Sequence, residues 1–137
     1  MKNLNLLAIL FLTLFSLTLS SCGKDDDDDV SPNVSLLTGG EWTGSAIYVD
    51  GEDLTDRIKE QQGFDWKAYT TTFERDGSYV ETYQGDVVVE GVWEYKNNER
   101  VILFDKDAQD EYEVVVSKLD EDEFWYIQDG AELRFRR

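Results

Sequence analysis

The chain has 137 residues, of which 41% are hydrophobic and 13% aromatic, so it is long enough for one domain with a buried core and too short for two. Its 13 Lys and Arg stand against 30 Asp and Glu, a formal net charge of −17; without Lys2 the remainder carries 12 against 30, or −18. A field of this sign repels nucleic acid and anionic lipid, and we expect neither as a partner.

Residues 1–21 have the organisation of a secretory signal peptide. Met1, Lys2 and Asn3 make a short cationic start, and residues 4–19 are mostly apolar and carry no charge. This length suits the hydrophobic region of a signal peptide and is too short for a membrane-spanning helix. We therefore expect the chain to be exported.

The only cysteine of the chain, Cys22, directly follows this segment. Leu19-Ser20-Ser21-Cys22 resembles the lipobox of bacterial lipoproteins, which implies that Cys22 is diacylated on sulfur, becomes the first residue after cleavage, and is acylated on its amino group. Two or three acyl chains hold a protein stably on a membrane. The alternative is an unpaired thiol, which is disfavoured in an oxidising compartment.

Five aspartates, residues 25–29, follow the cysteine after Gly23 and Lys24. Lys24, Asp25, Asp26 and Asp27 resemble the acidic export signal of Bacteroidetes lipoproteins, which implies a lipid-anchored protein on the outer face of the outer membrane. Like charges also extend a chain, so residues 22–35 are predicted to be a linker with a reach of up to ~45 Å. The alternative is a linker that is merely solvated.

Residues 36–137 are predicted to form one folded domain made of short alternating runs separated by turn residues. We expect eight strands, at 41–49, 67–75, 78–84, 86–96, 100–105, 111–118, 123–128 and 131–136. Short connections such as Asp76-Gly77, Asn97-Asn98 and Asp129-Gly130 imply antiparallel neighbours in chain order. The predicted fold is an all-β, eight-stranded antiparallel up-and-down barrel. A gapped half-barrel or sandwich, with a bulge at Gly85 or Gly91, is the alternative.

One short helix is predicted between the first two strands. Residues 53–60 begin at a plausible N-cap, Asp53, place Leu54 and Ile58 one turn apart, and stop near Gly63. The apolar stripe is too narrow for a core element. We expect either a lid on a cavity or a plug on a filled barrel.

Gly40-Glu41-Trp42, at the start of the first predicted strand, is similar to the G-x-W motif of lipocalins and fatty-acid-binding proteins. Over most of residues 36–137 the chain resembles the small lipocalin-like domains of Bacteroidetes lipoproteins, although it is shorter than the usual lipocalin and other lipocalin motifs are not evident. The resemblance implies a calycin-type barrel in which an arginine near the C-terminus stacks on that tryptophan. Because the last strand runs antiparallel to the first, Arg136 or Arg137 is expected there, in preference to Arg134.

A barrel of eight strands can hold one small ligand or be filled by side chains. The small residues on the inward faces of the predicted strands, Gly44, Ala46 and Gly91, would leave room for a ligand. The full set of candidate ligand-binding residues is Trp42, Gly44, Ala46, Phe73, Gly91, Trp93 and Tyr95. Without Phe11 and Phe15, 16 of the 18 aromatic residues remain after the leader. An aromatic interior with no cavity is therefore the alternative.

No catalytic residues, cofactor or metal are expected. The chain has no histidine, no free thiol once Cys22 is acylated, and no glycine-rich phosphate loop. Residues 105–111 contain oxygen ligands for calcium but lack the glycine and terminal glutamate of an EF-hand loop, so an ordinary acidic turn is expected.

The sequence thus favours a surface-anchored outer-membrane lipoprotein that binds a small, mostly apolar ligand or docks a cell-envelope protein through its barrel rim. The alternative is a structural or interaction lipoprotein with a side-chain-filled barrel and no ligand. A small hydrolase is a distant third. No feature of the sequence predicts an oligomeric state.

Overall fold

The computed structural model describes residues 30–137, so the predicted signal peptide, the lipidation site Cys22 and the acidic run lie outside the described residues. The elements in chain order are α3 (Pro32–Leu37), β1 (Trp42–Val49), β2 (Glu52–Asp53), α4 (Thr55–Gln62), the 3₁₀ turn η1 (Trp66–Ala68), β3 (Tyr69–Phe73), β4 (Ser78–Tyr83), β5 (Asp86–Lys96), β6 (Val101–Phe104), β7 (Tyr112–Leu119), β8 (Glu123–Gln128) and β9 (Ala131–Arg136).

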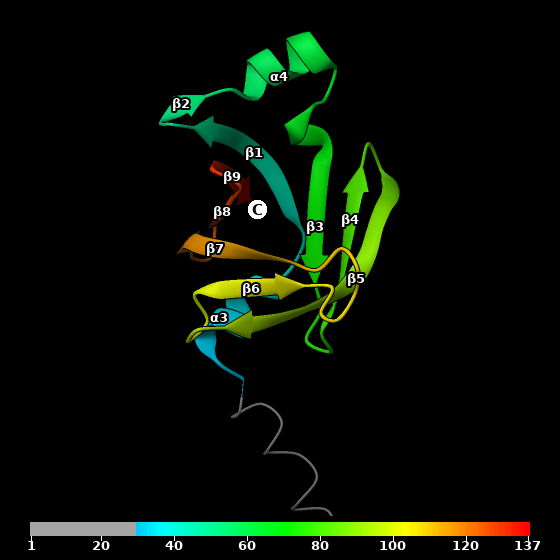
Figure 1. The fold of residues 1–137 in the computed structure, drawn as a ribbon, viewed down its shortest axis with the longest axis vertical. Coiled ribbons are helices and arrows are strands. Elements are labelled where there is room, and N and C mark those ends of the chain that lie inside the picture. Colours follow the sequence, from blue (N-terminus) through cyan, green and yellow to red (C-terminus); the bar gives the residue numbers. More distant parts are fainter. Residues whose placement is uncertain (1–29) are drawn as a thin grey trace, which may run out of the picture. The chain divides into compact units, whose positions relative to one another are not determined.

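The strands form one antiparallel sheet that closes on itself (Figure 1). From β3 to β9 each strand pairs with the next in chain order, and β1 pairs with both β3 and β9. The two-residue β2 adds only a short extension to the end of β1. Apart from β2, the eight strands confirm the predicted up-and-down barrel, and the short helix after β1 is confirmed as well.

The turn residues explain the tight connections. Asn97 and Asn98 have φ of 53° and 57°, and Asp129 and Gly130 have φ of 51° and 83°. Two consecutive residues in the left-handed region match the right-handed twist of paired strands, and asparagine, aspartate and glycine tolerate that region best. Asp129 and Gly130 therefore set the β8–β9 hairpin by local preference, and in the β5–β6 connection Glu99 continues the left-handed run with a φ of 65°.

Bulges in β1, β5 and β7 change which side chains face inward; the one in β7 lies between Val116 and Lys118. In β1 the register with β9 shifts between Gly44 and Ala46, so Ile47 is buried and the predicted inward position of Ala46 is wrong. In β5, Thr82 pairs with Val87 while Glu81 pairs with Val89, which leaves Val88 as the extra residue. Each bulge inserts one residue and reverses the alternation beyond it. The bulge predicted at Gly85 or Gly91 thus lies at Val88 instead.

The N-terminal boundary of the folded part also differs from the prediction. The compact unit begins at Pro32, not at residue 36, because residues 32–35 form the first turn of α3 where a linker was expected. Proline is favoured at the first position of a helix. Leu37 at the end of α3 is fully buried, and its carbonyl accepts a hydrogen bond from Trp42 Nε1 at 2.9 Å. A helix of six residues is too short to produce a periodic signal in the sequence.

The segment between β1 and β3 contains α4 and η1. The predicted N-cap residue Asp53 lies before α4, and its carboxylate accepts hydrogen bonds from the Thr55 backbone N–H and hydroxyl instead. The helix ends at Gly63, which has a left-handed φ of 72° as predicted. The strand predicted at 67–75 is shorter than expected, because Trp66–Ala68 form η1 before β3 begins. Within the described residues, no helix is long and apolar enough to cross a bilayer.

Candidate functional site

One end of the barrel interior is filled with aromatic rings. Phe73 lies at its centre, with ring centroids 5.5 Å from Trp93 and 5.8 Å from Phe124, and Trp42 lies 5.6 Å from Phe124. Each of these side chains is at most 8% exposed. We call this set the filled core: Leu37, Trp42, Phe73, Tyr79, Trp93, Phe104, Phe124 and Phe135. Three of the predicted ligand-binding residues, Trp42, Phe73 and Trp93, belong to it and leave no hollow between them.

The space predicted beside the small residues is occupied. A Cβ at Gly44 would lie 2.1 Å from the Trp66 carbonyl oxygen, and a Cβ at Gly91 would lie 1.9 Å from Asp105 Oδ1. Both distances are well inside van der Waals contact, so these glycines accommodate neighbouring groups of the protein itself. The bulge in β1 turns Ala46 away from the core, where it pairs with Arg134.

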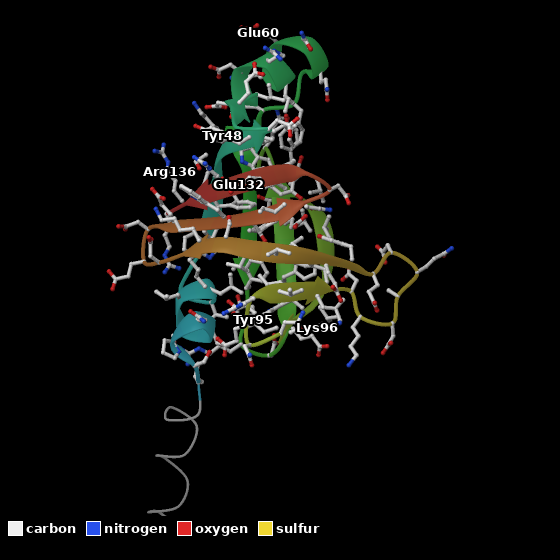
Figure 2. All side chains as sticks on the ribbon, turned by 60° about the vertical axis from the view of Figure 1, so that its left-hand side comes forward. Tyr48, Glu60, Tyr95, Lys96, Glu132 and Arg136 are labelled. Atoms are coloured by element: carbon white, nitrogen blue, oxygen red, sulfur yellow. The ribbon has the colours of Figure 1, made fainter. Side chains whose placement is uncertain are left out.

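The remaining predicted residue, Tyr95, packs at the α3 end of the barrel. Its ring meets Trp93 edge-on at 5.4 Å, and its hydroxyl lies 3.4 Å from the Asn33 carbonyl oxygen. Figure 2 shows Tyr95 beside α3, far from Glu60 on α4. None of the seven predicted residues lines the pocket that the structure places at the other end.

That pocket lies at the α4 end of the barrel and has a volume of about 320 Å³. Five strands and residues 64–66 contribute its walls, so the pocket is part of the barrel interior. It is lined by Phe64, Trp66, Tyr69, Glu81, Tyr112, Tyr126, Gln128 and Leu133. We call it the aromatic pocket. β3 connects the two regions, because it begins with Tyr69 in the pocket and ends with Phe73 in the filled core.

Stacked rings hold the wall that follows α4. Phe64 stacks on Tyr83 with centroids 5.0 Å apart, and Trp66 stacks on Tyr69 at the same distance. The indole Nε1 of Trp66 also donates a hydrogen bond to the Arg134 carbonyl oxygen at 3.0 Å, which ties this wall to β9. The segment after the helix, and not the predicted helical lid, therefore supplies residues to the pocket.

Glu81 is the charged residue of the pocket. Its side chain is on the inner face of β4, the residue is only 6% exposed, and its carboxylate accepts a hydrogen bond from the Tyr69 hydroxyl. Burial raises the pKa of Glu81 above the usual range for a glutamate, and the nearby charge of Asp105 raises it further. Burial also raises the pKa of the Tyr69 and Tyr126 hydroxyls, so both stay protonated at neutral pH.

Sequence reasoning missed Glu81 although a signal was present. The predicted strand 78–84 alternates Tyr79, Glu81 and Tyr83 on one face, so Glu81 shares a face with aromatic residues. In a chain with 30 acidic residues, this carboxylate was not singled out. A charged residue at an inward strand position was the signal that could have identified it.

A predicted closing contact is confirmed at the opposite end. The Arg137 guanidinium carbon lies 4.0 Å from the Trp42 ring centroid. Arg137 Nη1 donates to the Leu36 carbonyl oxygen at 2.9 Å, and Nε donates to the Glu121 carbonyl oxygen at 2.8 Å. The C-terminus thus clamps α3 and the β7–β8 turn over the filled core, which is a structural role.

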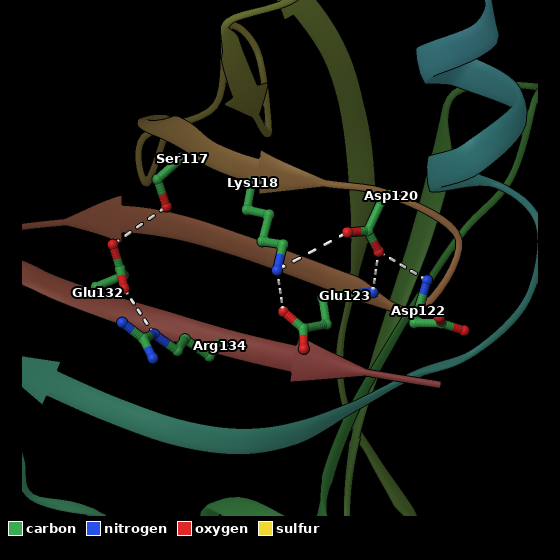
Figure 3. Close-up of polar contacts among 7 residues, drawn as sticks. All are labelled: Ser117, Lys118, Asp120, Asp122, Glu123, Glu132 and Arg134. Carbon is green, nitrogen blue, oxygen red and sulfur yellow. Dashed lines mark hydrogen bonds and ion pairs between the residues drawn. The ribbon is translucent and has the colours of Figure 1, made fainter.

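The outer face of β7, β8 and β9 carries a network of polar side chains (Figure 3). The Arg134 guanidinium lies between the rings of Tyr48 and Trp125, 3.7 Å and 3.8 Å from their centroids. Hydrogen bonds and ion pairs link the other members to it or to one another: Ser117, Lys118, Asp120, Asp122, Glu123 and Glu132. These charged groups already have hydrogen-bond or ion-pair partners, so the network stabilises the outer face of the barrel.

The acidic turn after β6 has a structural partner. Asp105 accepts hydrogen bonds from the Tyr79 hydroxyl at 2.9 Å and from the Val92 backbone N–H at 3.1 Å. Across residues 30–137, no group of three or more potential metal ligands is close enough to hold an ion.

Comparison with protein-family models and with curated protein sequences gave no match. Among solved structures, a DUF4847 family protein from Bacteroides vulgatus is similar, with a TM-score of 0.56, 12% identity, and coverage of 74% of this chain and 94% of that chain. A lipocalin-like protein from Bacteroides uniformis is also similar, with a TM-score of 0.53, 16% identity, and coverage of 72% and 96%. Both matches are at the level of the fold. The chain therefore has the lipocalin-like barrel fold seen in these Bacteroides proteins, as its sequence predicted.

Proposed function

We propose that this protein is a lipid-anchored lipoprotein of the outer membrane, exposed on the cell surface, whose barrel binds a small ligand in the aromatic pocket. The observation that carries the binding function is the pocket itself, a space of about 320 Å³ inside the barrel mouth lined mainly by aromatic rings. Ligand sites in proteins are concave and place a few polar groups among apolar and aromatic side chains, and this pocket combines five aromatic rings with the polar groups of Glu81, Gln128 and its tyrosines. Its volume is at the lower end of the usual range, which favours a small ligand.

Binding is favoured over catalysis by the chemistry of the side chains. The pocket offers one carboxyl group, three tyrosine hydroxyls and an amide, and the chain has no histidine. A nucleophile paired with a base is absent from the residues that line it. The tyrosines keep their protons at neutral pH because burial raises the pKa of each of these hydroxyls.

The filled core favours the second candidate, a structural or interaction lipoprotein without a ligand. The rings of the filled core pack the barrel interior around Phe73, at the end of β3. The two candidates differ in what they require of the aromatic pocket, since only the binding function needs it to be open.

Native mass spectrometry of the protein purified from its own cells tests the binding function. We expect an additional mass on the wild-type protein and its loss in Leu133→Trp, because the larger ring fills the pocket from β9. The matched control is Val115→Trp, which adds the same ring at an exposed position of β7. A protein without additional mass, or the same mass on Leu133→Trp, would favour the structural candidate.

The proposed location is tested separately. Replacing Cys22 with Ala should move the protein from the membrane fraction to the soluble fraction, because the acyl chains are lost. Replacing Asp25, Asp26 and Asp27 with Asn should leave the anchor intact and protect the barrel from protease added to whole cells. Unchanged digestion would contradict the role of the acidic residues in surface export.

A further inference from the structure

The aromatic pocket contains a buried carboxyl group, and no basic side chain is among the residues that line it. The carboxyl group belongs to Glu81. The titratable groups that face Glu81 are the hydroxyls of Tyr69, Tyr79, Tyr112 and Tyr126 and the carboxylate of Asp105. The donor to Glu81 among the described residues is the Tyr69 hydroxyl. A buried carboxylate in these surroundings favours a ligand that supplies positive charge.

The walls of the pocket attract a cation as well. Five of the eight lining residues are aromatic: Phe64, Trp66, Tyr69, Tyr112 and Tyr126. The face of an aromatic ring carries negative potential and binds ammonium groups, most strongly where water is excluded. Trp66 stacks on the ring of Tyr69, and the hydroxyl of that tyrosine contacts Glu81.

Other ligand classes fit less well. An anionic ligand would meet Glu81 with Asp105 behind it, in a chain whose net charge is −17. A purely apolar ligand would cover the Glu81 carboxylate and add no polar contact to the hydrogen bond from Tyr69, which costs free energy.

We propose that the aromatic pocket binds small organic cations, with the ammonium group of the ligand on the Glu81 carboxylate and its apolar body between the rings of Trp66, Tyr112 and Tyr126. This inference rests on the proposed binding function and names the ligand class. The Tyr69 hydroxyl acts as a positioning group, because its hydrogen bond orients the carboxylate toward the pocket.

Isothermal titration calorimetry with three probes that share a phenyl ring tests the ligand class. Phenethylamine is cationic at neutral pH, phenethyl alcohol is neutral, and hydrocinnamate is anionic. We expect the amine to bind the wild-type protein at least about tenfold more tightly than the alcohol, and the anion more weakly than either. Equal affinity of amine and alcohol, or preference for the anion, would overturn the inference.

Two variants of equal charge assign the effect to the pocket. Glu81→Gln should weaken the amine at least about tenfold and leave the alcohol within about twofold, since only the charge is removed. Glu90→Gln, at an exposed position of the same hairpin, should leave both affinities unchanged. An equal loss in both variants would assign the preference to the net charge of the protein and would overturn the site. Circular dichroism of each variant confirms that it is folded.

Failure of this inference can be told apart from failure of the proposed function. A neutral or anionic molecule found by native mass spectrometry, and lost in Leu133→Trp, would contradict the ligand class and retain the binding function. Absence of any copurified mass, together with no binding of the three probes, would contradict both.

Discussion

The two ends of this barrel use the same kind of side chain to opposite effect. In the filled core, rings from strands on different sides of the barrel pack on one another and exclude space, as Phe73 does with Trp93 and Phe124. In the aromatic pocket, Trp66 and Phe64 stack on the tyrosines of β3 and β4 and leave the centre open. Aromatic content alone therefore does not determine whether the interior of a small barrel is filled by side chains.

The difference follows from the seam between β1 and β3. These strands pair only at Trp42 with Thr71 and at Thr43 with Thr70, and β1 then continues along β9. Beyond the seam, η1 packs against β1, where Gly44 leaves room for the Trp66 carbonyl oxygen. The pocket therefore lies where the sheet is interrupted and an irregular segment, in place of a strand, completes the wall.

The largest effect is expected from breaking the filled core. Trp42→Ala should lower the free energy of unfolding by about 3–5 kcal/mol, because it removes a fully buried ring and leaves a cavity. It also leaves the Leu37 carbonyl oxygen without its hydrogen bond. Urea denaturation measures the change. Trp125→Ala, on the partly exposed outer face, is the control and should cost clearly less; equal losses would show that the filled core is not the main source of stability.

In the aromatic pocket, Glu81→Gln should stabilise the protein. The raised pKa means that the folded state holds this proton more tightly than the unfolded state. The contribution of Glu81 to stability is therefore complete at acidic pH, below the unfolded pKa, and is lost as the pH rises through the folded pKa. Glutamine avoids this loss, so we expect a gain in stability at neutral pH and little difference at acidic pH.

Urea denaturation across this pH range checks the sign. Glu90→Gln, at an exposed carboxylate, should follow the wild-type curve. A Glu81→Gln protein that is less stable than wild type at neutral pH would mean that the ionised carboxylate is favourable in the empty pocket.

A smaller effect is expected at Thr71, between the two regions. Its register partners are Trp42 in the filled core and Glu81 in the pocket, and its hydroxyl oxygen is buried without a hydrogen bond. Thr71→Val replaces that hydroxyl with a methyl group of similar size and should raise stability by about 1 kcal/mol. The control is Thr70→Val, which removes the hydrogen bond with Thr82 and should not stabilise. A destabilised Thr71→Val would reveal a partner for the hydroxyl.

The smallest effect is expected at the C-terminal clamp. Arg137→Gln should cost about 0.5–1 kcal/mol, since the cation–π contact with Trp42 is partly exposed to solvent. Thermal unfolding at low salt measures it, with Arg136→Gln as the control of equal charge. If both variants lose the same amount, the effect is one of net charge and the clamp contributes nothing specific.

Local chemistry made most of the barrel predictable. Alternation and paired turn residues placed the strands to within about two residues, because strand period and left-handed turn conformations depend on neighbours in sequence. The antiparallel order of a meander then brought β9 beside β1, and the same geometry selected the end of the chain for the contact with Trp42, which Arg137 makes. The proposed lipid anchor and export signal also rest on local motifs, in residues outside those that the structure describes.

The candidate site depended on tertiary structure. The bulge at Ser45 reversed the alternation that had placed Ala46 inside the barrel. The wall supplied by Phe64 and Trp66 comes from a segment with no regular period, and the burial of Glu81 requires rings from distant strands. An inward position can be read from neighbouring residues, but whether it meets a ring, a backbone carbonyl or open space is decided by residues far along the chain, because packing is a property of the assembled barrel.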